Sequence, residues 1–169
     1  RISEGPRMYF TEFGGQVKAL DAGGAVWTYA EGILNVDPLA PPSDISGQLG
    51  TSGIGVDPGS CDVFVSTVYR DDAGFKNKVI RFASDDGGRT AARVTDVLRL
   101  GDETTGPSHQ IHALLFADDG TLFAAVGNGL SCTPRCNKRR GLDDNFFGGK
   151  IIRLNRDGSA PRDNPFFDP

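Results

Sequence analysis

Short runs rich in apolar residues, β-branched and aromatic ones above all, recur along the chain, and each pair of runs ends in a turn rich in aspartate and glycine. The pairs are MYFTEF with QVKAL, VFVSTVY with KVIRF, and LFAAVG with KIIRL. The closing turns read DAGG at 21–24, DDGG at 85–88 and NRDG at 155–158. β-Branched and aromatic runs bounded by Asp and Gly are typical of antiparallel strands. The pattern therefore predicts three copies of one β unit.

Further apolar runs indicate four antiparallel strands in a complete unit. SGIGVDPGS and HALLFADDGT precede the second and third copies, and ARVTDVLRL follows the second. Four-stranded units repeating every 55 residues or so suit the blades of a β-propeller, at about 1–45, 46–105 and 106–169. A sandwich of the same strands is the alternative, disfavoured because sandwich strands need not repeat a unit. Three blades would leave sheet edges open, which predicts a piece of a longer protein.

Composition supports this all-β interpretation of one domain at 1–169. The chain holds 23 Gly and 10 Pro, and no window shows the apolar period of a long helix. The net charge of −4 argues against nucleic acid as a partner. No apolar run reaches the roughly 18 residues of a membrane span, and no signal-peptide pattern opens the chain, so we expect any leader to lie upstream.

The predicted topology brings three polar residues to one end of the sheets. Consecutive antiparallel strands reverse direction, so the loop before a unit's first strand and the loop between its second and third strands lie at the same end. Gln48 and His109 precede first strands, and Asn128 begins the long segment 128–147 between two later strands. We therefore expect these residues on one face, beside the long loop.

His109 is the candidate catalytic residue on that face. A neutral imidazole can accept a proton near physiological pH, which suits a general base. The alternative is a loop histidine that caps backbone groups. His112 is interpreted as a partly buried structural residue of the sheet rather than a second catalyst.

The long segment carries cysteines and basic residues. Cys132 and Cys136 have a spacing that permits a small disulfide loop, a question that spacing alone leaves open, and Cys61 is left over. Zinc is disfavoured because no further Cys or His follows at finger-like spacing. A basic cluster that either attracts an anionic ligand or is a solvated loop tip consists of Arg135, Lys138, Arg139 and Arg140.

Other residues are interpreted as structural. The Asp-Gly sequences at 118–120 and 157–158 are predicted turns rather than catalytic carboxylates. Trp27 and the Phe pairs at 146–147 and 166–167 are predicted packing anchors. No Walker loop, nucleophile elbow or dinucleotide fingerprint occurs, which sets those enzyme classes aside.

Four phrases together resemble the glucose/sorbosone dehydrogenase family: GGQVKALDAGG, GQLGTSGIGVDP, HQIHALLFADDGTLFAAVGNG and GGKIIRLNRDGSAPRDNPF. The resemblance covers nearly the whole chain, in the family's order. It implies a six-bladed propeller, of which this chain holds roughly the N-terminal half. It also implies pyrroloquinoline quinone (PQQ) as cofactor, a sugar substrate, an electron acceptor, and a periplasmic or secreted location.

The same resemblance implies roles for individual residues. His109 stands where the family has the base that removes the sugar hydroxyl proton, and Gln48 matches a glutamine near the cofactor. Asn128 stands where the family usually has an aspartate near the cofactor. The chain has Gln110, Ile111 and His112 where the family commonly has Asn or Ser and two glycines. The family's calcium ligands would lie beyond Pro169, so no metal ligand is assigned within this chain.

Two functions follow from these expectations. The first is PQQ-dependent oxidation of an aldose at its anomeric hydroxyl, with the isolated 169-residue piece inactive. The second is a non-catalytic propeller of the same family that binds a carbohydrate or a protein partner, since fold alone does not establish a reaction.

Overall fold

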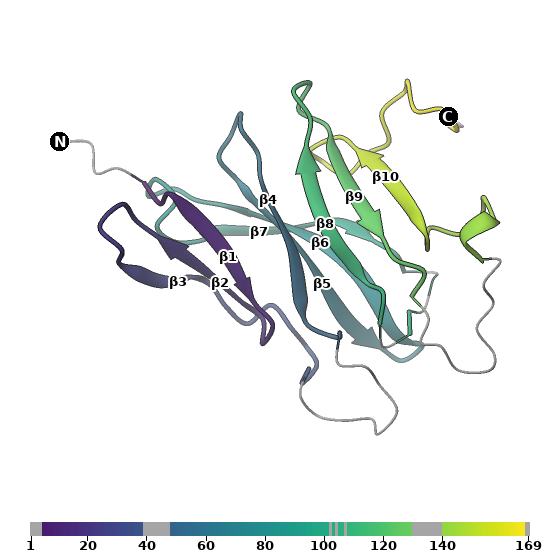
Figure 1. Cartoon of the computed structure of the whole chain (residues 1–169), viewed down its shortest axis with the longest axis horizontal. Helices are drawn as coiled ribbons and strands as arrows, with labels where there is room; N and C mark the ends of the chain where they lie inside the picture. The colour runs from purple at the N-terminus through teal and green to yellow at the C-terminus, as the bar shows by residue number, and fades with distance from the viewer. Residues whose placement is uncertain are drawn as a thin grey trace.

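The computed structural model describes residues 5–38, 48–101, 103, 105–106, 108–129 and 140–167, and within them the chain forms three antiparallel sheets (Figure 1). The first sheet consists of β1 (Met8–Glu12), β2 (Gln16–Leu20) and β3 (Val26–Ala30). The second consists of β4 (Thr51–Val56), β5 (Val63–Asp71), β6 (Gly74–Ala83) and β7 (Arg93–Arg99). The third consists of β8 (Ile111–Phe116), β9 (Leu122–Val126) and β10 (Lys150–Leu154).

The all-β prediction is confirmed, while the four-stranded unit is found only in the second sheet. In the repeat, β1, β5 and β9 correspond to one another, as do β2, β6 and β10. Among the described residues the first sheet therefore has no counterpart of β4, and the third has no counterpart of β7. The described helical structure is one short 3-10 turn, Arg140–Leu142, and no described helix is long and apolar enough to cross a membrane.

The core fills the two spaces between neighbouring sheets. One cluster joins the first and second sheets and includes Val17, Tyr29 and Phe82, with Trp27 packed against it as predicted. The other joins the second and third sheets around Phe64, whose ring meets that of Phe116 edge-on at 4.9 Å. Each sheet thus buries apolar side chains against its neighbour, which fixes the sheets relative to one another.

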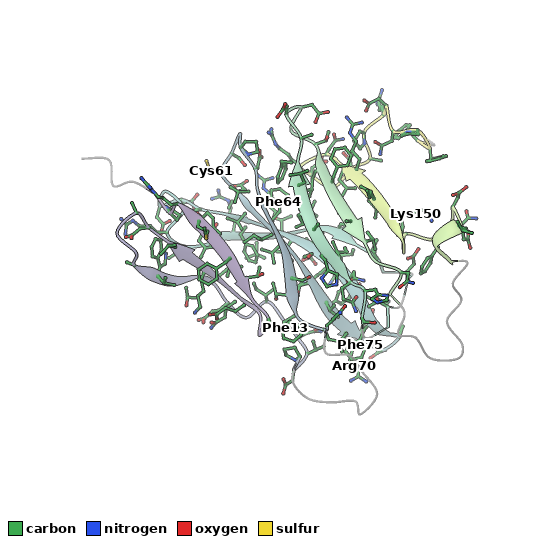
Figure 2. All side chains as sticks on the ribbon, in the orientation of Figure 1. Phe13, Cys61, Phe64, Arg70, Phe75 and Lys150 are labelled. Carbon is green, nitrogen blue, oxygen red and sulfur yellow. The ribbon has the colours of Figure 1, made fainter. Side chains whose placement is uncertain are left out.

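The strands define two ends of the molecule, which we call the site end and the turn end. At the site end β4 and β8 begin and β9 finishes, so it carries Gln48, His109 and Asn128. The turn end carries the hairpin turns at 57–62, 84–92 and 117–121 and the turn at 155–158 that follows β10. Figure 2 shows Cys61 at the turn end and Arg70 and Phe75 at the site end.

A close contact between β4 and β8 joins the second and third sheets near the site end. The hydroxyl groups of Ser52 and Ser66 both donate to the carbonyl of Ile111, at 2.7 and 2.6 Å. A Cβ at Gly53 would lie 3.1 Å from the His112 carbonyl oxygen and 2.7 Å from Ser66 Oγ. The absence of a side chain at Gly53 therefore lets the start of β8 approach the second sheet.

Candidate functional site

His109 has an unusual backbone conformation at the start of the third sheet. Its φ is +62°, in the left-handed region, which costs a non-glycine residue on the order of 1–2 kcal/mol. Its carbonyl accepts the N–H of Gly129 at 3.1 Å, and a Cβ at Gly127 would overlap that carbonyl. The close backbone contact with 127–129 holds His109 in this conformation and leaves its side chain exposed.

Gln48 and Asn128 both hydrogen-bond to His109. The His109 backbone N–H donates to Gln48 Oε1 at 2.7 Å, across the seam between the second and third sheets. His109 Nδ1 lies 2.6 Å from Asn128 Oδ1, at the end of β9. The structure thus brings together the three residues that strand reversal places at one end, although they come from distant parts of the sequence.

The Asn128 contact determines what the imidazole of His109 can do. With a carbonyl oxygen facing Nδ1, that nitrogen carries the proton, and Nε2 of the neutral ring keeps its lone pair. An exposed ring with Nε2 unprotonated can accept a proton from a hydroxyl group placed against it.

The side chain of Gln110 binds residues that precede His109 in the chain. Its side chain is 1% exposed, donates to the Gly106 carbonyl at 2.7 Å and accepts the Thr105 hydroxyl at 3.0 Å. Burial of this paired amide holds Thr105 and Gly106 beside Gln110, because an unpaired buried amide would cost free energy. Sequence reasoning missed this role, because no sequence motif distinguishes a buried, hydrogen-bonded glutamine after a histidine from an exposed one.

His112 is exposed, so its interpretation as a partly buried residue is wrong. A register shift between Ile111 and Ala113 in the pairing of β8 with β9 leaves His112 without a partner on β9. A bulge of this kind turns one side chain away from the regular alternation. His112 Nε2 comes to 3.3 Å from Gln48 Oε1, which makes His112 a fourth member of the cluster.

Lys150 anchors the last part of the long segment to β10. Its ammonium group donates to the carbonyls of Gly141, Asp143 and Phe146 at 3.0, 2.9 and 3.1 Å. The Phe147 N–H donates to Glu103 Oε1 at 2.7 Å, which ties the same segment to the loop after β7. Cys132, Cys136 and the side chains of the basic cluster lie outside the described residues, and Cys61 is a free, exposed thiol.

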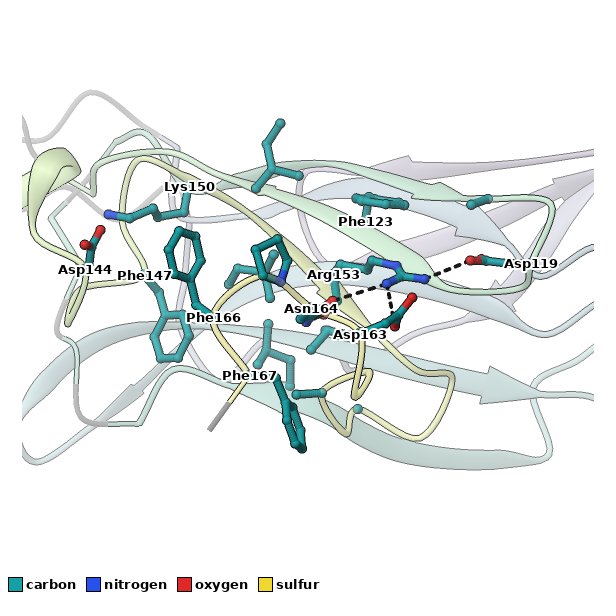
Figure 3. A pocket seen from close by; sticks show the side chains of 18 of the residues that line it. Asp119, Phe123, Asp144, Phe147, Lys150, Arg153, Asp163, Asn164, Phe166 and Phe167 are labelled. Atoms are coloured by element: carbon teal, nitrogen blue, oxygen red, sulfur yellow. Dashed lines mark hydrogen bonds and ion pairs between the residues drawn. The ribbon is translucent and has the colours of Figure 1, made fainter. Parts of the chain in front are cut away.

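A groove of about 1110 Å³ runs along β10 and does not include the histidine cluster (Figure 3). Its walls include Phe123, Phe147, Ile151 and Phe166, and Phe166 is 89% exposed. The prediction that both Phe pairs are packing anchors is therefore wrong for Phe147 and Phe166. In the second sheet, β6 pairs with β7, but β10, the counterpart of β6, is the last strand on its side of the third sheet. The groove therefore lies along an open sheet edge and away from the histidine cluster.

The turn end holds carboxylates whose partners are structural. Asp57 is 1% exposed; burial alone raises the pKa of its carboxyl group, but the Gly59 N–H, the Ser60 hydroxyl and Arg156 outweigh burial and lower that pKa. The Arg156 Nε atom lies 2.6 Å from Asp57 Oδ2 and joins the turns of two sheets.

Asp119 and Asp157 behave as the turn prediction requires. The Thr121 hydroxyl, the Thr121 N–H and Arg153 lower the pKa of Asp119 to about 2. Asp157 accepts the Ser159 N–H and hydroxyl at 3.0 and 2.7 Å. Both carboxylates are occupied by their own turns, which confirms a structural role.

The chemistry available at the site end is hydrogen bonding by amides and imidazoles and proton transfer by histidine. Among the described residues, no three His, Cys, Asp or Glu side chains gather as a metal ion would need. The site end therefore presents an exposed histidine whose backbone is bonded to Gln48 and whose ring faces Asn128.

Comparison of the sequence with family models identifies the family. Residues 2–169 match the model described as Glucose / Sorbosone dehydrogenase, and the chain belongs to that family. None of the curated proteins matches the sequence.

Solved structures with the same fold carry related descriptions. The apo soluble aldose sugar dehydrogenase from Escherichia coli superposes with a TM-score of 0.69 at 24% identity, over 98% of this chain and 45% of that one. The PQQ-bound aldose sugar dehydrogenase from Streptomyces coelicolor gives 0.68 at 22% identity, over 94% and 44%. A structure described as a glucose dehydrogenase gives 0.74 at 19% identity, over 98% and 49%. The chain spans less than half the length of these proteins, and at such identities the likeness shows the fold.

Proposed function

We propose that this chain is part of a PQQ-dependent sugar dehydrogenase that oxidises an aldose at its anomeric hydroxyl. The observation that carries the proposal is the exposed His109 with its Nδ1 facing Asn128 and its backbone bonded to Gln48. Membership of the glucose/sorbosone dehydrogenase family supports the sugar substrate and the oxidation. The PQQ-bound structure with the same fold supports the cofactor.

The residues present fit a quinone cofactor. The side chains of Gln48 and Asn128 offer amide groups that can donate hydrogen bonds to its carbonyl and carboxylate oxygens, while Nε2 of His109 stays unprotonated as the base. Gln48 and Asn128 would hold the cofactor beside His109. When bound, PQQ supplies the acceptor for the hydride that leaves the anomeric carbon.

His109 supplies the acid–base half of the reaction. Its Nε2 takes the proton of the anomeric hydroxyl while the hydride leaves the same carbon, and the sugar becomes a lactone. Asn128 holds the ring in the tautomer that leaves Nε2 unprotonated. Gln48 holds the His109 backbone, so the base keeps its position when the sugar arrives.

The larger assembly is part of the same proposal. The three sheets would be blades at about 1–45, 46–105 and 106–169 of a six-bladed propeller; the open edge of β10 and its apolar groove support further strands beside it. Calcium ligands, an external electron acceptor and a periplasmic or secreted location are proposed by family resemblance alone.

A reconstitution experiment tests the function. The full-length protein that contains this chain is loaded with PQQ and calcium and assayed with aldoses and an artificial electron acceptor. We expect turnover, and we expect His109→Ala to lower kcat about 10²- to 10⁴-fold while the protein stays folded. Tight PQQ loading without turnover would favour a non-catalytic binding propeller, and an active His109→Ala variant would remove His109 as the base.

A further inference from the structure

His112 has a side-chain direction that the regular strand would not give it. Ile111 pairs with Val126 and Ala113 with Ala125, so His112 is the extra residue of a bulge. Ile111 is 1% exposed and belongs to the core, whereas the neighbouring His112 is exposed. The bulge therefore directs the His112 side chain toward the site end, where it meets Gln48.

The orientation of the Gln48 amide follows from its hydrogen bond to the backbone. A backbone N–H can only donate, so the Gln48 atom 2.7 Å from the His109 nitrogen must be the oxygen. The same oxygen lies 3.3 Å from His112 Nε2, and it can only accept. Nε2 of His112 therefore carries a proton, and Nδ1 of the neutral ring is left with its lone pair.

The two rings thus present acceptors on the same end of the sheets. His109 directs Nδ1 to Asn128, and His112 directs Nε2 to Gln48. The remaining nitrogens, Nε2 of His109 and Nδ1 of His112, are the two hydrogen-bond acceptors. Among the described residues, neither of these nitrogens has a hydrogen-bond partner. Gln48 Oε1 connects the two residues, so their spacing is fixed by one amide group.

We propose that His112 is a sugar-binding residue, whose Nδ1 accepts a hydrogen bond from a second hydroxyl group of the sugar while Nε2 of His109 takes the proton of the first. The inference rests on the proposed function and adds a contact that selects the substrate. A sugar carries hydroxyl donors on adjacent carbon atoms, and two acceptors held by one amide can bind two of them.

A purely structural role for His112 is less consistent with the contacts. Its side chain is exposed rather than packed in the core. Its hydrogen bond to Gln48, at 3.3 Å, is longer than the 2.7 Å bond that the His109 backbone already makes to the same oxygen. The shorter bond to the His109 backbone already holds the Gln48 oxygen in place.

Two substitutions distinguish the role of Nε2 of His112 from the role of its Nδ1. In His112→Gln the terminal amide can still donate to Gln48, but no acceptor remains at the position of Nδ1. In His112→Asn the shorter amide places an oxygen near the position of Nδ1, but it cannot reach Gln48. Leu115→Gln, at an exposed position on the same strand away from the cluster, is the matched control.

The measurements use the full-length protein loaded with PQQ, with D-glucose and its monodeoxy analogues as probes. We expect His112→Gln to raise KM roughly five- to ten-fold, the value of one neutral hydrogen bond, with kcat nearly unchanged. His112→Asn should raise KM less than His112→Gln does, and Leu115→Gln should keep the wild-type KM. One monodeoxy sugar should bind the wild type and His112→Gln equally, because it lacks the hydroxyl that His112 contacts.

Binding without turnover provides the second measurement. In a His109→Ala background, titration calorimetry with D-glucose should show the same five- to ten-fold loss for His112→Gln. An unchanged KM and affinity in His112→Gln would overturn the inference, as would a loss confined to His112→Asn, which would assign His112 to the support of Gln48. If the wild-type protein neither binds nor oxidises any aldose, the proposed function itself fails, whereas an active wild type indifferent to His112 removes this inference alone.

Discussion

The two ends of the sheets are built from different chemistry. At the site end, neutral amides and imidazoles surround a residue in a strained backbone conformation. At the turn end, aspartates accept hydrogen bonds from their own turns and pair with arginines, as Asp57 does with Arg156 and Asp62 with Arg81. The turn end therefore joins neighbouring turns through ion pairs, whereas the histidine cluster at the site end is held by hydrogen bonds of amide groups.

Removal of the buried carboxylate at the turn end is expected to have the largest effect on stability. Asp57→Ala leaves the Gly59 N–H and Ser60 hydroxyl without their acceptor and Arg156 without its partner. We expect the free energy of unfolding to fall by about 3 kcal/mol, measured by urea denaturation. Asp163→Ala, which removes a 75% exposed partner of Arg153, should cost about 0.5 kcal/mol or less. Equal losses in the two variants would contradict the comparison.

Gly127→Ala tests whether the site end depends on close backbone contact. The added Cβ would overlap the His109 carbonyl, so the loop must shift. We expect a loss of about 1–3 kcal/mol in the free energy of unfolding and at least a ten-fold drop in kcat/KM. Gly101→Ala is the control, since a Cβ there meets nothing within 4 Å. Wild-type activity in Gly127→Ala would show that the His109 backbone is not held by this contact.

Asn128→Asp introduces a charge into the neutral cluster. A carboxylate beside His109 Nδ1 would favour the protonated ring, so the base would become neutral only at higher pH. We expect the acidic limb of the pH profile of kcat/KM to move up by about 1–2 pH units. Asn128→Ala should lower kcat without that upward movement, which separates the effect of charge from that of orientation. If the pH profile of kcat/KM in Asn128→Asp matched that of the wild type, residue 128 would not influence the protonation of His109.

Acid titration is expected to give the smallest effect on stability, and Asp119 at the turn end provides the test. The pKa of Asp119 is lowered to about 2, below the value near 3.9 of an unfolded chain, so its contribution to stability is present above about pH 4 and is lost as the pH falls toward about 2. Urea midpoints measured across this range should fall for the wild type and fall less steeply for Asp119→Asn. If the urea midpoints of the two proteins fell in parallel with pH, Arg153 and Thr121 would not stabilise the ionised form of Asp119.

Local signals in the sequence predict much of this arrangement. Asp-Gly turns form from contacts a few residues apart, so the turns at 117–121 and 155–158 could be predicted from composition. The reversal of antiparallel strands was enough to bring Gln48, His109 and Asn128 to one end. The roles of these residues remain predictions.

Features that depend on distant contacts could not be predicted. The bulge that turns His112 outward is set by the pairing of β8 with β9, and nothing in the apolar run IHALLF marks it. The pairing of Asp57 with Arg156 joins turns of two sheets and has no signature in either turn. The number of strands in each sheet likewise depends on which segments find a neighbouring edge, and repeat counting alone does not supply it.

The three carbonyl oxygens around Lys150 resemble the oxygen ligands that proteins use for hard cations, but here the positive charge is covalently attached to the chain. A chelator can remove a bound ion but cannot remove a side chain. The anchoring of segment 140–147 to β10 should therefore persist in EDTA. Any loss of activity that a chelator causes in the whole protein would report an ion bound somewhere other than this carbonyl cage.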